Sequence, residues 1–142
     1  FALAIALLDY LSELSGTFPI GHHIAMLWQD IPEKTAGNSC SAIELAVVPE
    51  KTDLIRKAAV RFIGDESVSD GWGIAIKTGF LIPDSLHQYG LRARTSLISC
   101  QEARQCAREC GIYTYGGGGI IGSLAAIGLA HEPEDLIITP DF

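Results

Sequence analysis

The alternation of apolar and polar positions along the chain separates helical segments from extended ones. Apolar residues recur every three or four positions between Leu3 and Leu14, which predicts an amphipathic first helix. A second periodic stretch follows Thr52, which we expect to cap a helix that continues through Phe62. The run Ile120–Ala130 is apolar on nearly every side, and a helix of that kind is buried.

Shorter apolar segments, bounded by proline, glycine and polar residues, predict strands between these helices. They are His22–Gln29, Cys40–Val48, Trp72–Lys77, Ile112–Tyr115 and Leu136–Thr139, with a turn at Ser15–Pro19 and a short extended piece at Ser96–Ile98. Further helices are predicted at Asp84–Ala93 and Cys100–Cys110, the second after a capping box formed by Ser99 and Glu102. Strands and helices alternate without a repeat, so we expect an α/β fold, a mixed sheet with helices packed on it, in one domain spanning residues 1–142.

Composition narrows the class of protein. The 142 residues are 48% hydrophobic and 19% charged, which is typical of a globular domain with a real core. A formal net charge of −7 argues against an extended nucleic-acid interface. The longest apolar runs are too short to cross a bilayer, and Phe1–Leu8 lacks the basic flank and the small-residue cleavage site of a secretory signal. We therefore expect a cytoplasmic protein without a membrane partner.

The four cysteines are candidates for metal or redox chemistry. No Cys-x-x-Cys pair is present, and Cys106 and Cys110 fall on the apolar stripe of their predicted helix. We therefore expect buried, reduced thiols. A cysteine-based redox function stays open, and it requires an exposed thiol with a lowered pKa.

The run Gly116–Gly119 directly precedes the buried helix and is the leading candidate for a ligand site. Glycines lack a Cβ atom that would hold a ligand away, and the helix that follows adds a favourable potential for anions. We expect the amides of Gly117 and Gly119 to be donors to a phosphate. The alternative is a flexible turn that leads into a core helix.

Three segments, in chain order, resemble one family. Residues 31–38, Ile-Pro-Glu-Lys-Thr-Ala-Gly-Asn, are similar to the Ile-Pro-Tyr-Lys-Thr-Arg-Gly-Asn loop of the archaeal agmatidine synthetases, which modify the wobble cytidine of an isoleucine tRNA. Residues 117–128, Gly-Gly-Gly-Ile-Ile-Gly-Ser-Leu-Ala-Ala-Ile-Gly, resemble their Gly-Arg-Gly-Leu-Ile-Gly-Ala-Leu-Ala-Ala-Val-Gly segment. Ser69-Asp70-Gly71 resembles the Ser-Asp-Pro-Gly turn of shorter bacterial relatives of the same kinase-like domain.

The resemblance implies an ATP-dependent, kinase-like domain in which the glycine loop meets the nucleotide phosphates. The residues it singles out for phosphate contact are Gly116, Gly117, Gly118, Gly119 and Gly122. Lys34 would supply a positive charge, while Thr35 and Asn38 would orient oxygens during transfer. Asp65 and Asp70 are the candidate ligands of Mg²⁺, which prefers carboxylate oxygens and water. Each of these side chains has an alternative role as a solvated loop residue.

Departures from the family pattern matter for function. Family members open with a strand that carries an Asp-Asp-x-Asp cluster, and we expect that strand to lie just before Phe1, outside the given chain. Ala36 and Gly118 stand where the family has arginines, which together with the net charge argues against tRNA as a substrate. The leading hypothesis is a nucleotide-dependent transferase that acts on a small molecule. The alternative is a non-catalytic binding module that kept the fold, and homo-oligomerisation stays open in either case.

Overall fold

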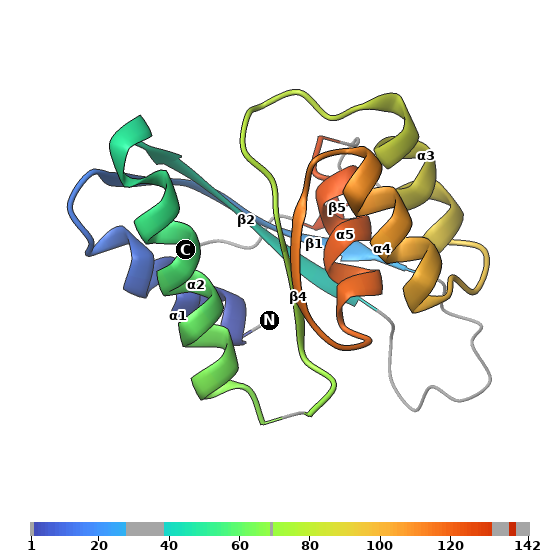
Figure 1. Cartoon of the computed structure of the whole chain (residues 1–142), viewed down its shortest axis with the longest axis horizontal. Coiled ribbons are helices and arrows are strands. Elements are labelled where there is room, and N and C mark those ends of the chain that lie inside the picture. Colours follow the sequence, from blue (N-terminus) through green and yellow to red (C-terminus); the bar gives the residue numbers. More distant parts are fainter. Residues whose placement is uncertain (1, 28–38, 69, 132–136, 139–142) are drawn as a thin grey trace.

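A computed structural model describes residues 2–27, 39–68, 70–131 and 137–138. Helices and strands alternate along the chain (Figure 1). The elements are α1 (Ala2–Ser12), β1 (Thr17–Met26), β2 (Ser39–Val47), the short 3-10 helix η1 (Pro49–Lys51), α2 (Thr52–Glu66), β3 (Gly73–Ile76), α3 (Asp84–Ala93), α4 (Cys100–Glu109), β4 (Tyr113–Gly116), α5 (Ile120–Gly128) and β5 (Ile137–Ile138). The α/β class predicted from the sequence is confirmed.

The described strands form two antiparallel sheets. One sheet has the order β2-β1-β5, and its long β1–β2 hairpin pairs Thr17 with Val47 at one end and Met26 with Ser39 at the other. The second sheet contains β3 and β4, with Gly73 opposite Gly116. The strands are therefore divided between two sheets in the described residues, whereas the sequence predicted a single mixed one.

Two local predictions were wrong. The first strand begins at Thr17 and passes through Pro19, where we expected a turn. Pro19 lies beside a register shift in the β1–β2 pairing, where the missing N–H of proline is tolerated. Thr52 is the first residue of α2 and does not cap it, because a turn of 3-10 helix from Pro49 to Lys51 leads directly into the helix.

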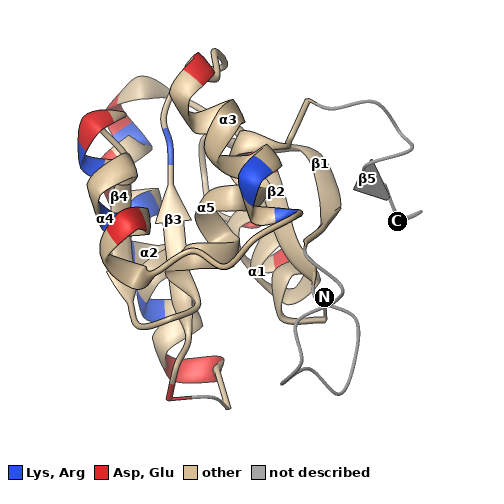
Figure 2. Ribbon diagram, turned by 90° about the vertical axis from the view of Figure 1, so that its right-hand side faces the viewer, with Lys and Arg blue, Asp and Glu red and all other residues tan. Residues whose placement is uncertain are grey.

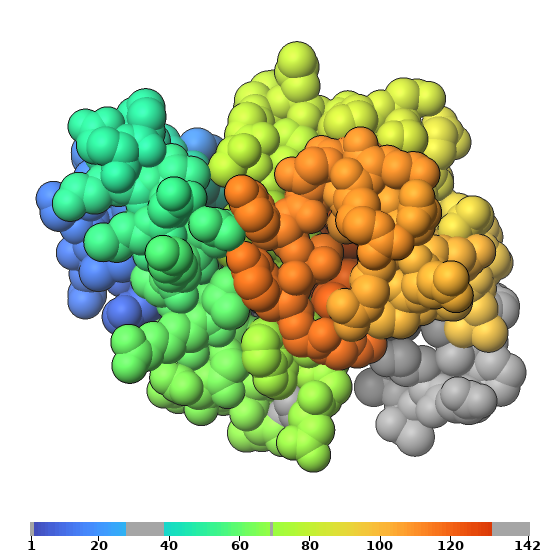
Figure 3. Space-filling view, in the orientation of Figure 1, coloured from blue at the N-terminus to red at the C-terminus, as the bar shows by residue number. Residues whose placement is uncertain are grey.

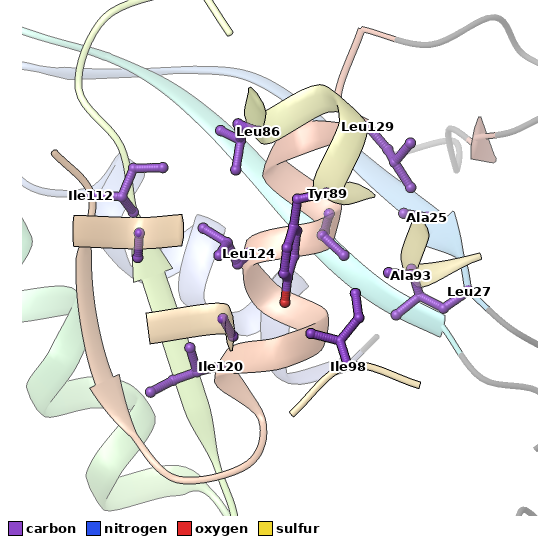
Figure 4. Packing of buried hydrophobic residues seen from close by; sticks show 14 residues of the cluster. Ala25, Leu27, Leu86, Tyr89, Ala93, Ile98, Ile112, Ile120, Leu124 and Leu129 are labelled. Carbon is purple, nitrogen blue, oxygen red and sulfur yellow. The ribbon is translucent and has the colours of Figure 1, made fainter. Parts of the chain in front are cut away.

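The larger core cluster surrounds α5. Ile120 and Leu124 of this helix are fully buried, together with Leu86 of α3 (Figure 4). Tyr89 points into the same cluster, and its hydroxyl donates a hydrogen bond of 2.9 Å to the carbonyl oxygen of Ile121. Burial raises the pKa of this phenol, so it stays a neutral donor. The prediction of a buried helix after the glycines is confirmed.

A smaller cluster lies between α1, α2 and the strands. Leu7 and Leu11 of α1 pack with Ile55, Ala59 and Ile63 of α2, and half-buried aliphatic residues of β2 and β3 complete the cluster. Figure 1 shows the β1–β2 hairpin running from the α1–α2 pair to the group formed by α3, α4 and α5. The hairpin thus joins the two halves of the core.

Charge gathers on the outer helices. The segments β3, β4 and α5 contain no charged residue, whereas the Lys, Arg, Asp and Glu residues concentrate on α2, α3 and α4 (Figure 2). The helix α4 starts with the predicted capping box, in which the Ser99 hydroxyl accepts from the Glu102 amide and the Glu102 carboxylate accepts from the Ser99 amide. Across the described ranges, no helix combines the length and apolarity that a membrane span requires.

Candidate functional site

Two backbone hydrogen bonds connect the glycine loop, Gly116–Gly119, to the turn that precedes β3. The amide of Gly117 donates to the carbonyl oxygen of Trp72 over 2.7 Å, and the amide of Gly119 donates to that of Gly71 over 2.8 Å. Two of the segments that resemble the agmatidine synthetases and their relatives are therefore in direct contact. The fold brings together a turn and a loop that lie more than forty residues apart in the sequence.

These hydrogen bonds correct the expectation that Gly117 and Gly119 offer open donors. Both amides are taken by the protein's own carbonyl groups, so in this structure neither is available to a phosphate. Gly118 lies between them at the exposed tip of the loop. Within the described ranges, no backbone hydrogen bond uses its amide.

The four loop positions differ in whether the surrounding atoms leave room for a side chain. A Cβ atom on Gly116 would lie 2.2 Å from the Trp72 carbonyl oxygen, and its φ of +98° favours glycine as well. On Gly119 a Cβ would lie 2.5 Å from the amide nitrogen of Gly73. On Gly117 its nearest neighbour would be 3.7 Å away, and on Gly118 nothing lies within 4 Å. Packing therefore requires Gly116 and Gly119 but does not require Gly117 or Gly118.

Gly122 is placed differently from the loop glycines. Within α5 it faces inward, where an added Cβ would lie 3.4 Å from both Leu27 and Cys40. Its neighbour Ser123 donates a hydrogen bond of 2.9 Å to the Gly73 carbonyl oxygen, and the Cys40 thiol lies 3.9 Å from the Ser123 hydroxyl. Gly122 thus serves the close approach of α5 to β2, and the structure gives it no direct place at the loop tip.

The predicted metal ligands are exposed. Asp65 lies in the last turn of α2, and Asp70 lies in the turn beside Gly71. No group of three or more Asp, Glu, His or Cys residues within the described ranges has the arrangement of a metal site. Magnesium binding remains a prediction, for which Asp70 has the closer position because its turn contacts the loop. Lys34, Thr35 and Asn38 lie outside the described residues.

Arg104 is a cationic neighbour of the loop that the sequence analysis did not single out. One of its guanidinium nitrogens donates a hydrogen bond of 3.1 Å to the Gly116 carbonyl oxygen. The sequence assigns this residue to the polar face of a capped helix, which carries no functional signal. The tertiary fold places α4 beside β4, the strand that ends at Gly116 (Figure 2).

A second polar cluster joins α2 to β4. Arg56 donates to the Tyr115 hydroxyl over 2.9 Å and to the Asp53 carboxylate over 3.1 Å. Its guanidinium carbon also lies 4.0 Å from the centre of the Tyr113 ring, which is a cation–π distance. Figure 3 shows the face on which α2 and β4 meet. These contacts make Arg56 a structural tie between the two elements.

The surroundings of two of the four thiols keep them protonated. All four cysteines are free. Burial raises the pKa of the Cys40 thiol, and burial together with the neighbouring Cys110 raises that of Cys106 to about 11. A redox function requires a thiolate at neutral pH, which neither of these two residues supplies.

Comparison with known proteins relates the chain to an archaeal group. It is 31% identical over 116 residues to the uncharacterized protein MJ0921 of Methanocaldococcus jannaschii, a match that covers 80% of this chain and 39% of that protein. It is 28% identical over 123 residues to the tRNA 2-agmatinylcytidine synthetase TiaS of Pyrobaculum neutrophilum, covering 84% of this chain and 28% of the synthetase. The chain thus spans well under half the length of each relative. No protein-family model matches the sequence.

These similarities support a distant relation to the synthetase group whose motifs the sequence resembles.

Proposed function

We propose that this chain is the nucleotide-binding part of an ATP-dependent transferase related to the 2-agmatinylcytidine synthetase, with the ATP phosphates bound at the tip of the glycine loop. The observation that carries the proposal is the contact between the loop and the Asp70–Gly71 turn, two segments that resemble the same family. Gly117 and Gly118 add support, since packing does not require either of them to be glycine. A bare backbone at an exposed loop tip leaves room for a phosphate.

The loop tip has the chemistry that a phosphate group needs. The Gly118 amide is a donor without a backbone partner among the described residues, and the first turn of α5 adds the positive end of a helix dipole. Arg104 brings a guanidinium to the base of the loop, and its planar group suits a phosphate oxygen. By sequence, Lys34 would add a second cation from the preceding loop.

Magnesium fits the proposal only as an ion that arrives with the nucleotide. Asp70 lies next to Gly71, whose carbonyl oxygen accepts the Gly119 amide. Mg²⁺ keeps waters and phosphate oxygens as most of its ligands. When bound, the ion would neutralise charge on the phosphate oxygens. The part played by the protein is to position the nucleotide with Gly118, Arg104 and Asp70. The acidic net charge favours a small-molecule acceptor over a nucleic acid.

A thermal-shift titration with MgATP tests the proposal. At about a hundred times the dissociation constant, bound nucleotide stabilises the folded state by about 2.7 kcal/mol. The informative variant is Gly118→Val, because its side chain enters open space and leaves the fold intact. We expect it to abolish the shift, whereas Thr95→Val, at an exposed position at the end of α3, keeps it. Equal shifts in both variants, or no shift with the unmodified chain, would refute binding at this loop.

A non-catalytic binding module is the second candidate. The occupied amides of Gly117 and Gly119 favour it, because they leave the loop fewer donors than the sequence predicted. The two functions differ in turnover. A bound nucleotide that is never consumed, with amines and nucleosides offered as acceptors to the full-length protein, would establish the module and exclude the transferase.

A further inference from the structure

Two cysteines lie one helical turn apart at the end of α4. Cys106 is inside the helix, and Cys110 caps its C-terminus with helical backbone angles. Residues four positions apart share a face of a helix, so the two thiols are neighbours. Both are free and half-buried, and both pack against the larger core cluster.

The two thiols interact with each other and with the neighbouring helix. A hydrogen bond to Cys110 and the charge of Cys110 both help to raise the pKa of Cys106, after burial as the largest cause. The Ser85 hydroxyl, on α3, lies 3.5 Å from the sulfur atom of Cys110. The fold thus holds two sulfur atoms together, with a polar group from a second helix beside them.

A groove between α3 and α4 gives access to this pair. It has a volume of about 930 Å³, and Cys106 belongs to its lining together with residues of both helices. Figure 1 shows the two helices side by side, with α5 behind them. A small ion can therefore reach the sulfur of Cys106 from solvent, while the apolar core closes the other side of the pair.

We propose that Cys106 and Cys110 form a two-coordinate site for a soft monovalent metal ion, for which Cu(I) is the biological candidate. Thiolates are the protein ligands that Cu(I) prefers. Binding forms two copper–sulfur bonds and releases one proton from each thiol, without a change in oxidation state. The inference does not depend on nucleotide binding, and its test uses no nucleotide.

The number of ligands separates Cu(I) from zinc. Zn²⁺ takes three or four protein ligands. Within the described ranges, no group of three or more Asp, Glu, His or Cys residues could hold a metal ion. Two thiolates suffice for a monovalent ion bound in a line, with sulfurs about 4.6 Å apart, twice a typical metal–thiolate bond. That span suits residues whose Cβ atoms are about 5–6 Å apart, as four positions along a helix provide.

Part of the cost of deprotonating the pair disappears when the ion is bound. Removing both protons brings two negative sulfurs together, and like charges disfavour ionisation. A cation between the sulfurs replaces this repulsion with attraction. The Ser85 hydroxyl would then donate to the Cys110 thiolate and hold its orientation, as groups behind the ligands do in metal sites.

Competition with a chromogenic Cu(I) chelator, in the absence of oxygen, tests the proposal. The probe is Cu(I) added to the reduced chain 1–142, and we expect one ion per chain. Cys106→Ser and Cys110→Ser should each lower the affinity by more than about a hundredfold, the upper range for changes behind the ligands. Cys100→Ser is the matched control, because Cys100 is a half-buried thiol at the other end of the same helix. It should keep the affinity of the unmodified chain.

Thermal unfolding of the metal-free variants checks that each is folded, and X-ray absorption of the copper-loaded, unmodified chain counts the ligands directly. We expect two sulfur neighbours around the copper. A third sulfur, or a complex of two chains in sedimentation, would overturn a site made by one pair of thiols. Absence of binding, equal affinities of Cys106→Ser and Cys100→Ser, or Zn²⁺ bound as tightly as Cu(I) would overturn it as well.

Discussion

The amide of Gly119 donates a 2.8 Å hydrogen bond to the carbonyl oxygen of Gly71, which fixes the glycine loop to the turn before β3. With its neighbour at Gly117, this bond turns a run of four glycines into a defined structure. The loop is consequently not a free set of donors. It is a tight connection whose outer tip, at Gly118, is exposed to solvent.

Gly119→Ala should destabilise the protein strongly, whereas Gly118→Ala should leave its stability nearly unchanged. The added Cβ of Gly119→Ala would lie 2.5 Å from the Gly73 amide nitrogen, so β3 and the loop must separate. We expect a loss of about 2–3 kcal/mol in the free energy of unfolding, as for other overpacked sites. Gly118→Ala meets no atom within 4 Å and should change stability by less than about 0.5 kcal/mol. Urea denaturation of both variants measures the contrast, and similar losses would disprove the assigned packing.

Patterning predicted the helices better than the backbone connections. The bounds of α3 and the capping box of α4 follow from local signals, namely a proline before Asp84 and the Ser99/Glu102 spacing. The start of β1 does not, because Pro19 usually marks a turn and is tolerated here only beside an irregularity in the pairing. Local sequence carries no information on that pairing.

In the candidate site, too, the sequence predicted the residues but not the contacts they make. The glycine run and the Asp70 turn stand out in the sequence, but the hydrogen bonds that consume the Gly117 and Gly119 amides depend on partners at Trp72 and Gly71. Arg104 was missed for the same reason, since its helix reaches the loop only through the tertiary fold. Residue types indicate which chemistry is available, and long-range contacts decide which groups remain free for it.

The hydroxyl of Tyr115 should contribute measurably to stability. It accepts a hydrogen bond of 2.9 Å from Arg56, a residue 59 positions away. Hydrogen bonds from charged donors contribute more to stability than those between neutral groups. Tyr115→Phe should therefore lower the free energy of unfolding by about 1.5 kcal/mol. Tyr10→Phe is the control, because the Tyr10 ring stacks on Phe62 and that contact survives the change.

A double-mutant cycle with Arg56→Met separates this bond from general packing. The coupling energy between Arg56 and Tyr115 should be about 1 kcal/mol. Purely additive effects of the two substitutions would show that the hydrogen bond contributes nothing to stability.

Cys106 should react slowly with thiol reagents in the folded protein. Its pKa of about 11, against an ordinary value of 9.0, follows from burial and from the nearby Cys110. At pH 7.5 the thiolate population is about a hundredfold below that of an ordinary cysteine. The labelling rate should fall by at least about tenfold, because a thiolate of higher pKa is the stronger nucleophile and offsets part of the loss. Mass spectrometry of tryptic peptides, with the urea-unfolded protein as reference, gives the rate for each cysteine. Labelling of native Cys106 at the unfolded rate would contradict its burial.

The buried imidazole of His22 should make the protein less stable in mild acid. This side chain is fully buried, and burial lowers its pKa below the value of 6.5 found in unfolded chains. The unfolded state then binds more protons than the folded state below about pH 6.5, so the free energy of unfolding falls as the pH drops from there towards the folded-state pKa. Above about pH 7 both states carry a neutral imidazole, and the contribution of His22 no longer changes with pH.

Urea denaturation across this pH range measures the contribution of His22. The prediction is a steeper loss of stability between about pH 6.5 and 5 in the unmodified chain than in His22→Gln. Parallel pH profiles for the unmodified chain and His22→Gln would mean that His22 takes up its proton without unfolding the core around it.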